Sequence, residues 1–315
     1  MGRGRGDGPQ IDGLAIVDKP AGWTSHDVVA RCRKVFGQRR VGHSGTLDPD
    51  ATGVLLVGLG RVTRLLRFLS DLEKVYTAEV VLGVATSTLD ATGEVTGTWD
   101  MTGISLDEVR AATVALTGPI LQIPPMVSAV QIDGKRLYDL ARQGIEVERE
   151  ARLVVVYAFS VEDPVVPRQP NGAIFPISVR CSSGTYVRTL AADLGAALGG
   201  GAHLRNLRRT GIGPFTVDRA VPLDVLTPAD YVSPAEAIGH LPVLHASGEV
   251  ALAVAHGKVL DAGALFPEGG PDSGGTGGPW AVLGVGGELL AVYEAHRGGT
   301  VKPAVVVAEP PATTR

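Results

Sequence analysis

The sequence predicts a mixed α/β (α+β) protein built from two domains. Its 315 residues, 44% of them hydrophobic, suffice for a sizeable core, and this length favours two domains over one. Strand-like and helix-like segments alternate along most of the chain, without the regular strand-helix-strand units of a parallel sheet. Residues 243–309 are mostly strand-like, which predicts a small β-barrel-like module at that end.

The N-terminal elements follow from their residue patterns. Residues 11–19 predict a short strand, and residues 53–60 and 75–86 are rich in β-branched side chains, as buried or half-buried strands are. Between them, a Ser/Thr cap and a terminal glycine enclose a predicted helix at 25–36. One stripe of that helix carries the apolar residues Val28, Val29, Cys32, Val35 and Phe36.

The middle of the chain alternates in the same way. Ser105 and Glu108 form a capping box, which predicts a helix that ends at Leu116. The Asp-Gly pair at 133–134 predicts a tight hairpin turn, followed by a helix at 136–142.

The last elements lead into the C-terminal module. Residues 173–183 predict a strand, and residues 187–198 predict a helix with an apolar inner face. A proline-containing connector follows at 227–242. A glycine-rich segment at 269–279 predicts a flexible loop inside the module.

Charge is distributed unevenly along the chain, although the formal net charge is only −4. From residue 220 onward four Lys/Arg stand against ten Asp/Glu, whereas residues 1–219 hold 25 against 23. The segments 31–40 and 203–209 contain basic residues and no acid, which is typical of a surface that follows a phosphate backbone or of a solvated helix face. The candidate phosphate contacts are Arg31, Lys34, Arg39, Arg40, Arg205, Arg208 and Arg209.

Other classes of protein are disfavoured by the sequence. No apolar run approaches the roughly 18 residues that span a membrane. Cys32 and Cys181 lie far apart, and the seven histidines never fall at metal-ligand spacing. We therefore expect a cytoplasmic protein without a structural metal.

Asp48 is the first candidate for chemistry, within the stretch GHSGTLDPDATG at 42–53. An Asp-Pro pair most often makes a turn or a helix N-cap. Here no helical periodicity follows Pro49, and the flanking glycines would let the backbone approach a ligand closely. Taken alone, these residues leave both interpretations open.

Arg188 and Tyr76 are the next candidates. Arg188 falls at the start of the predicted helix 187–198, where the helix dipole disfavours a cation and no acid occupies the first turn. Its charge requires an anion from elsewhere, such as Asp48 or a phosphate. Tyr76 is an aromatic residue on a strand of an aromatic-poor chain, where it serves either as core or as a stacking surface.

Six motifs between residues 14 and 219 resemble, in order, those of the TruB family of bacterial tRNA pseudouridine-55 synthases. GHSGTLDPDATGVLLVGLGRVTRLL is similar to the family's G-H-T-G-T-L-D-P-x-A-T-G-V-L, and VDKPAGWTS to its K-P-x-G-x-T-S. The other four are KVYTAEVVLGVATSTLDATGE, PPMVSAVQIDGKRLYDLAR, SSGTYVRTLAADLG and GAHLRNLRRTGIGPF. Two departures are Ser44 for the usual Thr and Gln131 where Lys is common.

The resemblance implies a pseudouridine-synthase-like catalytic domain, a large mixed sheet flanked by helices, at 11–235. It also implies a PUA-like β-barrel domain at 243–309. Residues 1–10 and 310–315 are expected to be disordered tails.

Matched position by position, the motifs imply roles for single residues. Asp48 looks like the catalytic carboxylate and Arg188 like the arginine that keeps it charged in a dry pocket. Tyr76 resembles the aromatic residue that stacks on the target uracil. Lys19 and Asp90 match further motif positions, for which a structural role is as plausible.

Three more positions match residues around the target base. His43 looks like the residue that helps to hold the RNA open. Tyr186 and Leu207 resemble residues of the uracil pocket.

The function implied is isomerisation of uridine 55, in the TΨC arm of tRNA, to pseudouridine. No atom enters or leaves in this reaction, so no cofactor is expected. We expect tRNA as the partner of a monomer, with no membrane or protein partner. The alternative is an RNA-binding or RNA-folding protein without catalysis. A nucleotide-phosphate enzyme is disfavoured, because no Lys follows the glycines of residues 42–60 as a P-loop requires.

Overall fold

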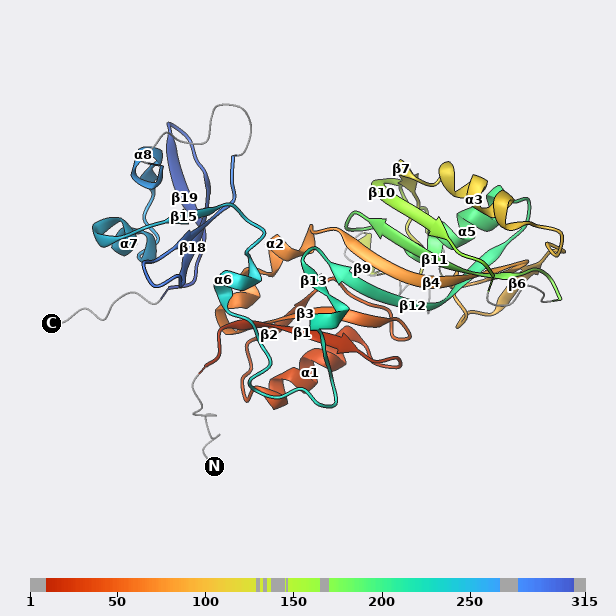
Figure 1. Cartoon of the computed structure of the whole chain (residues 1–315), viewed down its shortest axis with the longest axis horizontal. Coiled ribbons are helices and arrows are strands. Elements are labelled where there is room, and N and C mark those ends of the chain that lie inside the picture. Colours follow the sequence, from red (N-terminus) through yellow and green to blue (C-terminus); the bar gives the residue numbers. More distant parts are fainter. Residues whose placement is uncertain are drawn as a thin grey trace.

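The computed structural model describes residues 10–128, 131–132, 135–136, 145, 147–164, 170–266 and 277–308. A ten-stranded sheet and a five-stranded sheet, both with helices packed on them, confirm the mixed α/β class (Figure 1). Within this part of the chain no helix is long and apolar enough to cross a lipid bilayer.

The large sheet is mixed in strand direction, as predicted. Its β1–β14 and β3–β12 pairs are parallel, and its other pairs are antiparallel. Its main path runs through β14 (Val221–Pro222), β1 (Gly13–Lys19), β3 (Thr52–Leu59), β12 (Ala202–Ile212), β4 (Lys74–Leu82), β11 (Ile174–Cys181), β10 (Arg152–Val161) and β7 (Gly118–Gln122). In addition, β2 (Val41–Ser44) pairs with β3, and β13 (Phe215–Thr216) pairs with β12.

Strand β3 lies near the middle of one half of the sheet and is buried on both faces. Leu55 and Val57 pack on one face with the apolar stripe of α1 (Ser25–Val35). Val54 and Leu56 pack on the other face with α2 (Leu66–Ser70). A continuous apolar run of this kind is what a strand covered on both faces requires.

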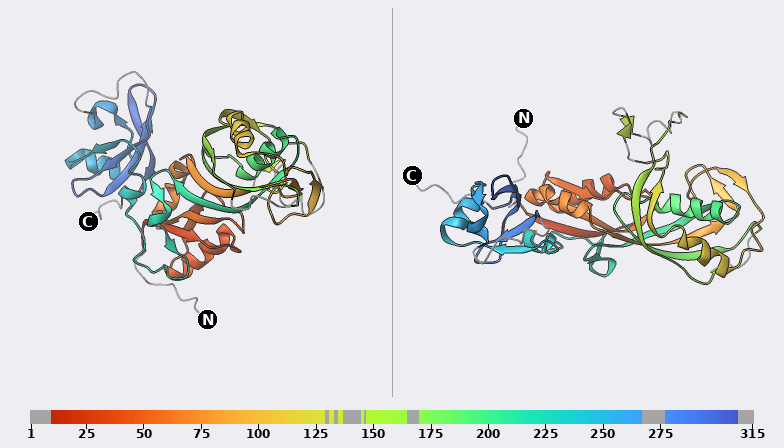
Figure 2. Two further views of the ribbon diagram at one scale, coloured as in Figure 1. Left: turned by 45° about the vertical axis from the view of Figure 1, so that its right-hand side comes forward. Right: turned by 90° about the horizontal axis from the view of Figure 1, so that it is seen from above.

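The other half of the sheet packs its core against α3 (Leu106–Val114) and α5 (Val187–Ala197). Figure 2 shows these two helices at one end of the elongated molecule and the C-terminal sheet at the other. The predicted apolar face of α5 is confirmed, because Val187, Leu190 and Leu194 are buried. The connecting 3-10 turns are η1 (Gly60–Arg64) and η2 (Val217–Arg219).

The C-terminal module is a curled five-stranded sheet with α7 (Gly248–Ala255) and α8 (Ala262–Leu265) beside it (Figure 1). A short helix, α6 (Pro234–Ala237), precedes it. Among the described residues the sheet stays open, since its order begins and ends on different strands. That order is β15 (Val243–His245), β17 (Trp280–Leu283), β18 (Leu289–Ala295), β19 (Thr300–Val306) and β16 (Leu260–Asp261).

The two sheets share part of their core. Leu289 and Val292 of the C-terminal sheet belong to the same buried cluster as Leu14, Leu56 and Leu69. Because this apolar contact is continuous, the domain division at residues 235–243 stays a prediction.

The helix limits were predicted closely. Thr24 caps α1, and its side chain accepts a hydrogen bond from the amide of Asp27. Ser105 and Glu108 form the predicted capping box of α3. That helix ends at Val114, two residues earlier than expected, and continues as turns.

Of two further expectations, one is wrong and one agrees with the structure. The segment 203–209 is part of strand β12, so its interpretation as a solvated helix face is wrong. The strands β8 (Gln131–Ile132) and β9 (Lys135–Arg136) pair antiparallel, as the predicted hairpin requires.

Several predicted segments cannot be followed fully. The turn at 133–134 and most of the helix predicted at 136–142 lie outside the described residues. The same holds for most of the glycine-rich loop and for nearly all of both predicted tails. The remaining ribbon is β5 (Val84–Thr86) with β6 (Val95–Thr98).

Candidate active site

Asp48 lies on the loop that joins the antiparallel strands β2 and β3. Several hydrogen bonds hold this loop in place. The amide of Leu47 donates to Ser25 Oγ at 3.0 Å, and the amide of Ala51 donates to the carbonyl oxygen of Asp48 at 3.2 Å. Lys19 Nζ donates to the carbonyl oxygen of Pro49 at 2.7 Å. The residues on either side of Asp48 are therefore anchored to α1 and to β1.

The glycines of this loop allow close backbone packing. Gly53 has a φ of +100°, and a Cβ built there would lie 2.1 Å from the carbonyl oxygen of Arg209. A side chain at residue 53 would therefore push β3 away from β12. The sequence interpretation, that these glycines admit a ligand, is wrong for Gly53, because its neighbour is strand β12.

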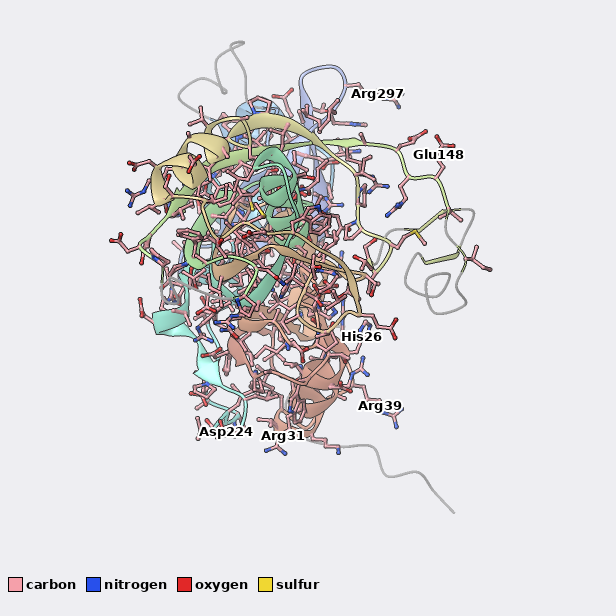
Figure 3. The ribbon with its side chains drawn as sticks, turned by 90° about the vertical axis from the view of Figure 1, so that its right-hand side faces the viewer. His26, Arg31, Arg39, Glu148, Asp224 and Arg297 are labelled. Atoms are coloured by element: carbon pink, nitrogen blue, oxygen red, sulfur yellow. The ribbon has the colours of Figure 1, made fainter. Side chains whose placement is uncertain are left out.

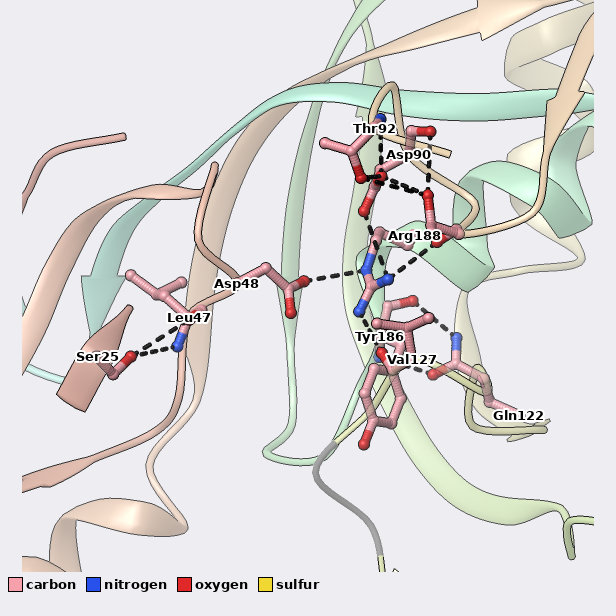
Figure 4. Close-up of polar contacts among 10 residues, drawn as sticks. Ser25, Leu47, Asp48, Asp90, Thr92, Gln122, Val127, Tyr186 and Arg188 are labelled. Carbon is pink, nitrogen blue, oxygen red and sulfur yellow. Dashed lines mark hydrogen bonds and ion pairs between the residues drawn. The ribbon is translucent and has the colours of Figure 1, made fainter. Parts of the chain in front are cut away.

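Arg188 reaches Asp48 from the first turn of α5 (Figure 4). Its Nε lies 3.0 Å from Asp48 Oδ2, and its Nη1 lies 3.4 Å from Asp90 Oδ2. The same guanidinium donates to the carbonyl oxygens of Thr88 at 2.9 Å and of Val127 at 2.8 Å. A cation at the start of a helix is thus paired with two carboxylates from elsewhere, as its position in the sequence requires.

Asp90 is held rigidly for this contact. Its Oδ1 accepts hydrogen bonds from Thr88 Oγ1 at 2.6 Å, from Thr92 Oγ1 at 2.6 Å and from the Thr92 amide at 3.0 Å. Its other oxygen faces Arg188. Asp90 therefore belongs to the charged cluster around Asp48, a role that the motif position left open.

Exposure distinguishes the two partners of the central ion pair. The side chain of Arg188 is 5% exposed and that of Asp48 is 42% exposed, so the carboxylate faces solvent in front of a buried cation. Burial of the loop raises the pKa of Asp48, Arg188 and Lys19 lower it, and Asp90 raises it further. The net direction is upward, although water at the exposed carboxylate weakens the effect of burial.

Asp48 and Arg188 line a cavity of about 360 Å³ together with Tyr76, Tyr186 and Leu207. Ligand pockets in proteins commonly measure roughly 300–1,000 Å³, so a single base fits this space. The structure therefore brings five of the predicted site residues, from four separate segments of the chain, around one cavity.

Two of the cavity's aromatic residues are positioned by their neighbours. Tyr76 lies on β4 with 9% of its surface exposed, and burial raises the pKa of its hydroxyl. The backbone of Tyr186 is held by Gln122, whose side chain accepts from the Tyr186 amide at 2.7 Å and donates to its carbonyl oxygen at 3.1 Å. Gln122 was not predicted as a site residue, because along the sequence it is a polar residue at the end of a strand like many others.

His43 does not line this cavity. It lies on β2, and its ring packs edge-on against the ring of His26, with centroids 5.3 Å apart. Burial, followed by the nearby His26 and Arg209, lowers the pKa of His43 to about 4. His43 is therefore neutral near pH 7.

The predicted phosphate contacts separate into two groups. Arg31, Lys34, Arg39 and Arg40 are exposed on α1 and the turn after it. Within the described part of the chain none of the four forms an ion pair, although Arg40 donates to Thr63 Oγ1 at 3.1 Å. Figure 3 places Arg39 on the same side of the molecule as His26 and Glu148, with Arg31 at the lower end. These four remain candidates.

The arginines of β12 are different. Arg205 Nε lies 2.5 Å from Glu79 Oε2, and Arg208 donates to both oxygens of Asp18 at 3.0 and 2.7 Å. Arg209 is only 1% exposed. The prediction that Arg209 contacts an RNA backbone is wrong, because a fully buried guanidinium cannot reach a phosphate. Arg205 and Arg208 are already neutralised by carboxylates.

Family models match most of the described sheet. The model described as the N-terminal domain of the TruB family pseudouridylate synthases matches residues 33–187. A second model, the tRNA pseudouridylate synthase B C-terminal domain, matches residues 188–238.

Curated relatives match nearly the whole chain. A tRNA pseudouridine synthase B of Thermobifida fusca (strain YX) is 48% identical, over 94% of this chain and 99% of that one. Another, of Arthrobacter sp. (strain FB24), is 43% identical, over 95% of this chain and 97% of that one.

A solved structure has a similar fold. It is an H/ACA ribonucleoprotein bound to a substrate RNA that contains 2'-deoxyuridine. The superposition has a TM-score of 0.68 at 25% identity, and it covers 95% of this chain and 86% of that chain.

Proposed function

Because the chain belongs to the TruB family of pseudouridylate synthases, we propose that it acts on tRNA and converts uridine 55 of the TΨC arm to pseudouridine. It is an isomerase, since pseudouridine has the same atoms as uridine. We further propose Asp48 as its catalytic carboxylate.

The observation that carries this proposal is the ion pair of Asp48 and Arg188 at the wall of a cavity that Tyr76 also lines. The exposed carboxylate can meet a ribose or a base, and the buried guanidinium behind it fixes its direction. Arg188 is in turn held by two backbone carbonyls and by Asp90. Such preorganisation favours reaction over mere binding, because the charges need no rearrangement when the substrate reacts.

Tyr76 supports the proposal through base stacking. A uridine inside a folded RNA arm must leave its stack to meet Asp48, which costs a few kcal/mol. Stacking on an aromatic side chain returns about 1–3 kcal/mol per base. Tyr76, with Tyr186 and Leu207, therefore offsets much of the cost of extrusion. His43 lies on β2, the strand that leads into the Asp48 loop, and we propose that it helps to hold the RNA open.

The RNA backbone is assigned to the exposed basic residues of α1 and the turn after it. Contacts from Arg31, Lys34, Arg39 and Arg40 would position the RNA without reading its sequence. We propose that the protein works as a monomer in the cytoplasm and binds the TΨC stem-loop across this surface and the cavity.

The test is a comparison of the wild-type protein with Asp48→Asn on unmodified tRNA transcript, with pseudouridine mapped by position. We expect pseudouridine at position 55 with the wild type, and none with Asp48→Asn although that variant still binds tRNA. Asp50→Asn is the matched control, because Asp50 lies two residues away, is exposed, and forms no ion pair within the described part of the chain. Turnover by Asp48→Asn, or modification at another position, would contradict the proposal.

A further inference from the structure

Arg209 heads the large side chains that are fully buried among the described residues, with 1% of its surface exposed. It extends from β12 and binds the loop of Asp48 at both ends. Its Nε donates to the carbonyl oxygen of Val54 at 2.8 Å, and its Nη2 donates to the carbonyl oxygen of Gly45 at 2.8 Å. The loop that carries Asp48 runs between these two carbonyls.

Arg209 is also next to the base-stacking residue. It is the cross-strand partner of Tyr76 in the antiparallel pair of β12 and β4. Both residues line the cavity that Asp48 and Arg188 line. A single guanidinium thus contacts the loop of the catalytic carboxylate and adjoins the stacking surface.

The charge of Arg209 is unpaired in the part of the chain that the structure describes. Arg205 and Arg208 of the same strand pair with Glu79 and Asp18, whereas no carboxylate forms an ion pair with Arg209. Burying a charge without a counter-ion costs several kcal/mol. A guanidinium cannot avoid this cost by losing its proton. Two neutral carbonyls accept hydrogen bonds from it, and the Tyr76 side chain interacts with it, but these neutral partners leave the charge uncompensated.

The field of Arg209 extends over the surroundings of the cavity. After burial, Arg209 is the next cause of the lowered pKa of Lys74, which is about 8. It also contributes to the lowered pKa of His43 and of Lys19. The cavity therefore has a positive wall, and its other buried arginine, Arg188, is occupied by Asp48 and Asp90.

The isomerisation creates a negative charge in that cavity. When the C1′–N1 bond of the nucleotide breaks, its electron pair leaves with the uracil, which becomes an anion, and the positive charge left at C1′ is balanced by the Asp48 carboxylate at the cavity wall. The base then turns, and C5 forms a bond to C1′. C5 loses its proton and N1 gains one, so that atoms and charge balance without an oxidant or reductant. Between these two bond changes, an anionic base lies in the cavity.

We propose that Arg209 is a positioning residue whose buried charge stabilises the detached, negatively charged uracil while its hydrogen bonds hold the Asp48 loop. This inference rests on the proposed function. It assigns Arg209 no contact with the RNA backbone, so that RNA binding does not depend on it. A preorganised positive charge in a dry site favours a developing anion strongly, because no solvent has to rearrange.

The experiment compares Arg209→Lys, which keeps the charge, with Arg209→Met, which has similar length and no charge. Arg209→Lys can still donate to one of the two carbonyls, whereas Arg209→Met can donate to neither. Arg209→Gln, which is neutral and can donate to one carbonyl, is therefore measured beside Arg209→Lys, so that this pair differs chiefly in charge. We expect kcat of Arg209→Met to fall about 10²–10³-fold, as after loss of one oxyanion-hole donor. The kcat of Arg209→Lys should fall much less. KM for tRNA should be unchanged in both variants. Equal losses in the two variants would overturn the inference in favour of a purely structural role.

A second measurement tests the charge on the base directly. In 4-thiouridine the base is more acidic than in uridine and C5 still carries a hydrogen, so its anion needs less stabilisation. With tRNA carrying 4-thiouridine at the target position, we expect the ratio of the wild-type kcat to the kcat of Arg209→Met to be smaller than with uridine. An equal difference with both substrates would overturn the inference. If Arg209→Met does not fold, Arg209→Gln replaces it, because Gln is neutral and can still donate to one carbonyl.

The two proposals fail in different ways. A wild-type protein that forms no pseudouridine would contradict the proposed function. A wild-type protein that forms it, with Arg209→Met equally fast, would contradict only the role of Arg209. A loss of tRNA affinity in Arg209→Met at unchanged kcat would likewise overturn this role.

Discussion

Lys19 and Pro49 are joined by a hydrogen bond of 2.7 Å from Nζ to the carbonyl oxygen. Lys19 is fully buried at the end of β1, and it also donates to the carbonyl oxygens of Pro20 at 2.9 Å and of Trp23 at 2.6 Å. Burial lowers its pKa to about 8. One ammonium group therefore connects the turn after β1 to Pro49, the residue that follows Asp48.

Lys19→Met should loosen this connection. The change removes the Lys19 donor from three partly buried carbonyl oxygens, of which that of Pro49 keeps the Gly22 amide as a donor at 3.0 Å. A carbonyl left unpaired away from water costs about 1–3 kcal/mol. We expect a lower urea midpoint and a larger loss of kcat than of tRNA affinity. Lys34→Met, on the exposed face of α1, is the control and should leave the midpoint unchanged. An unchanged midpoint in Lys19→Met would mean that the loop is held by its other contacts alone.

Asp90→Asn should slow the reaction through Arg188. It removes one of the two carboxylates that pair with the buried guanidinium, so that Asp48 alone balances its charge and the guanidinium is held less firmly. We expect turnover to fall at least tenfold while tRNA still binds. Asp100→Asn is a matched control, because Asp100 accepts the same two hydrogen bonds from Thr102 that Asp90 accepts from Thr92. Equal turnover in the two variants would exclude a role for Asp90.

The stability of the protein should fall in mild acid because of His43. Its pKa is about 4 when folded against an ordinary value of 6.5, so the unfolded chain binds a proton more readily between these values. Stability is therefore lost as pH falls from 6.5 to 4, by up to about 3 kcal/mol at 1.36 kcal/mol per pKa unit. His43→Gln should flatten the dependence of the melting temperature on pH in this window. His296→Gln, at an exposed site, is the control and should leave this pH dependence unchanged. If the melting temperature of His43→Gln falls with acid as steeply as that of the wild type, the burial of His43 is not the cause of the acid sensitivity.

The exposed basic residues should govern the salt dependence of tRNA binding. Each phosphate contact contributes about 0.9 to the slope of log K against log salt on a duplex. We expect Lys34→Gln and Arg39→Gln each to reduce the slope by about that amount. Arg208→Gln should change it less, because Arg208 is paired with Asp18. A larger change for Arg208→Gln than for Arg39→Gln would contradict the assignment of the RNA backbone to the residues of α1 and the turn after it.

Local patterns in the sequence predicted the elements well. Four features depend only on neighbours within a few residues, so their patterns are visible along the chain. They are the caps of α1 and α3, the apolar face of α5 and the buried run of β3. The position of Arg188 at a helix start predicted an anionic partner for the same reason. The helix alternative for residues 203–209 was wrong, because a basic run on a central strand depends on which strands pair with it.

By itself, the sequence determined the class of the fold and the chemistry available at Asp48, Tyr76 and Arg188. Its family motifs also assigned these three residues to one active site. Only the tertiary structure decided which cations are free to meet RNA. Arg205, Arg208 and Arg209 are alike in sequence, yet two of them are paired with carboxylates from other strands and one is buried. The physical reason is that charge is a property of a residue, whereas its compensation and its exposure belong to contacts between segments far apart in the chain.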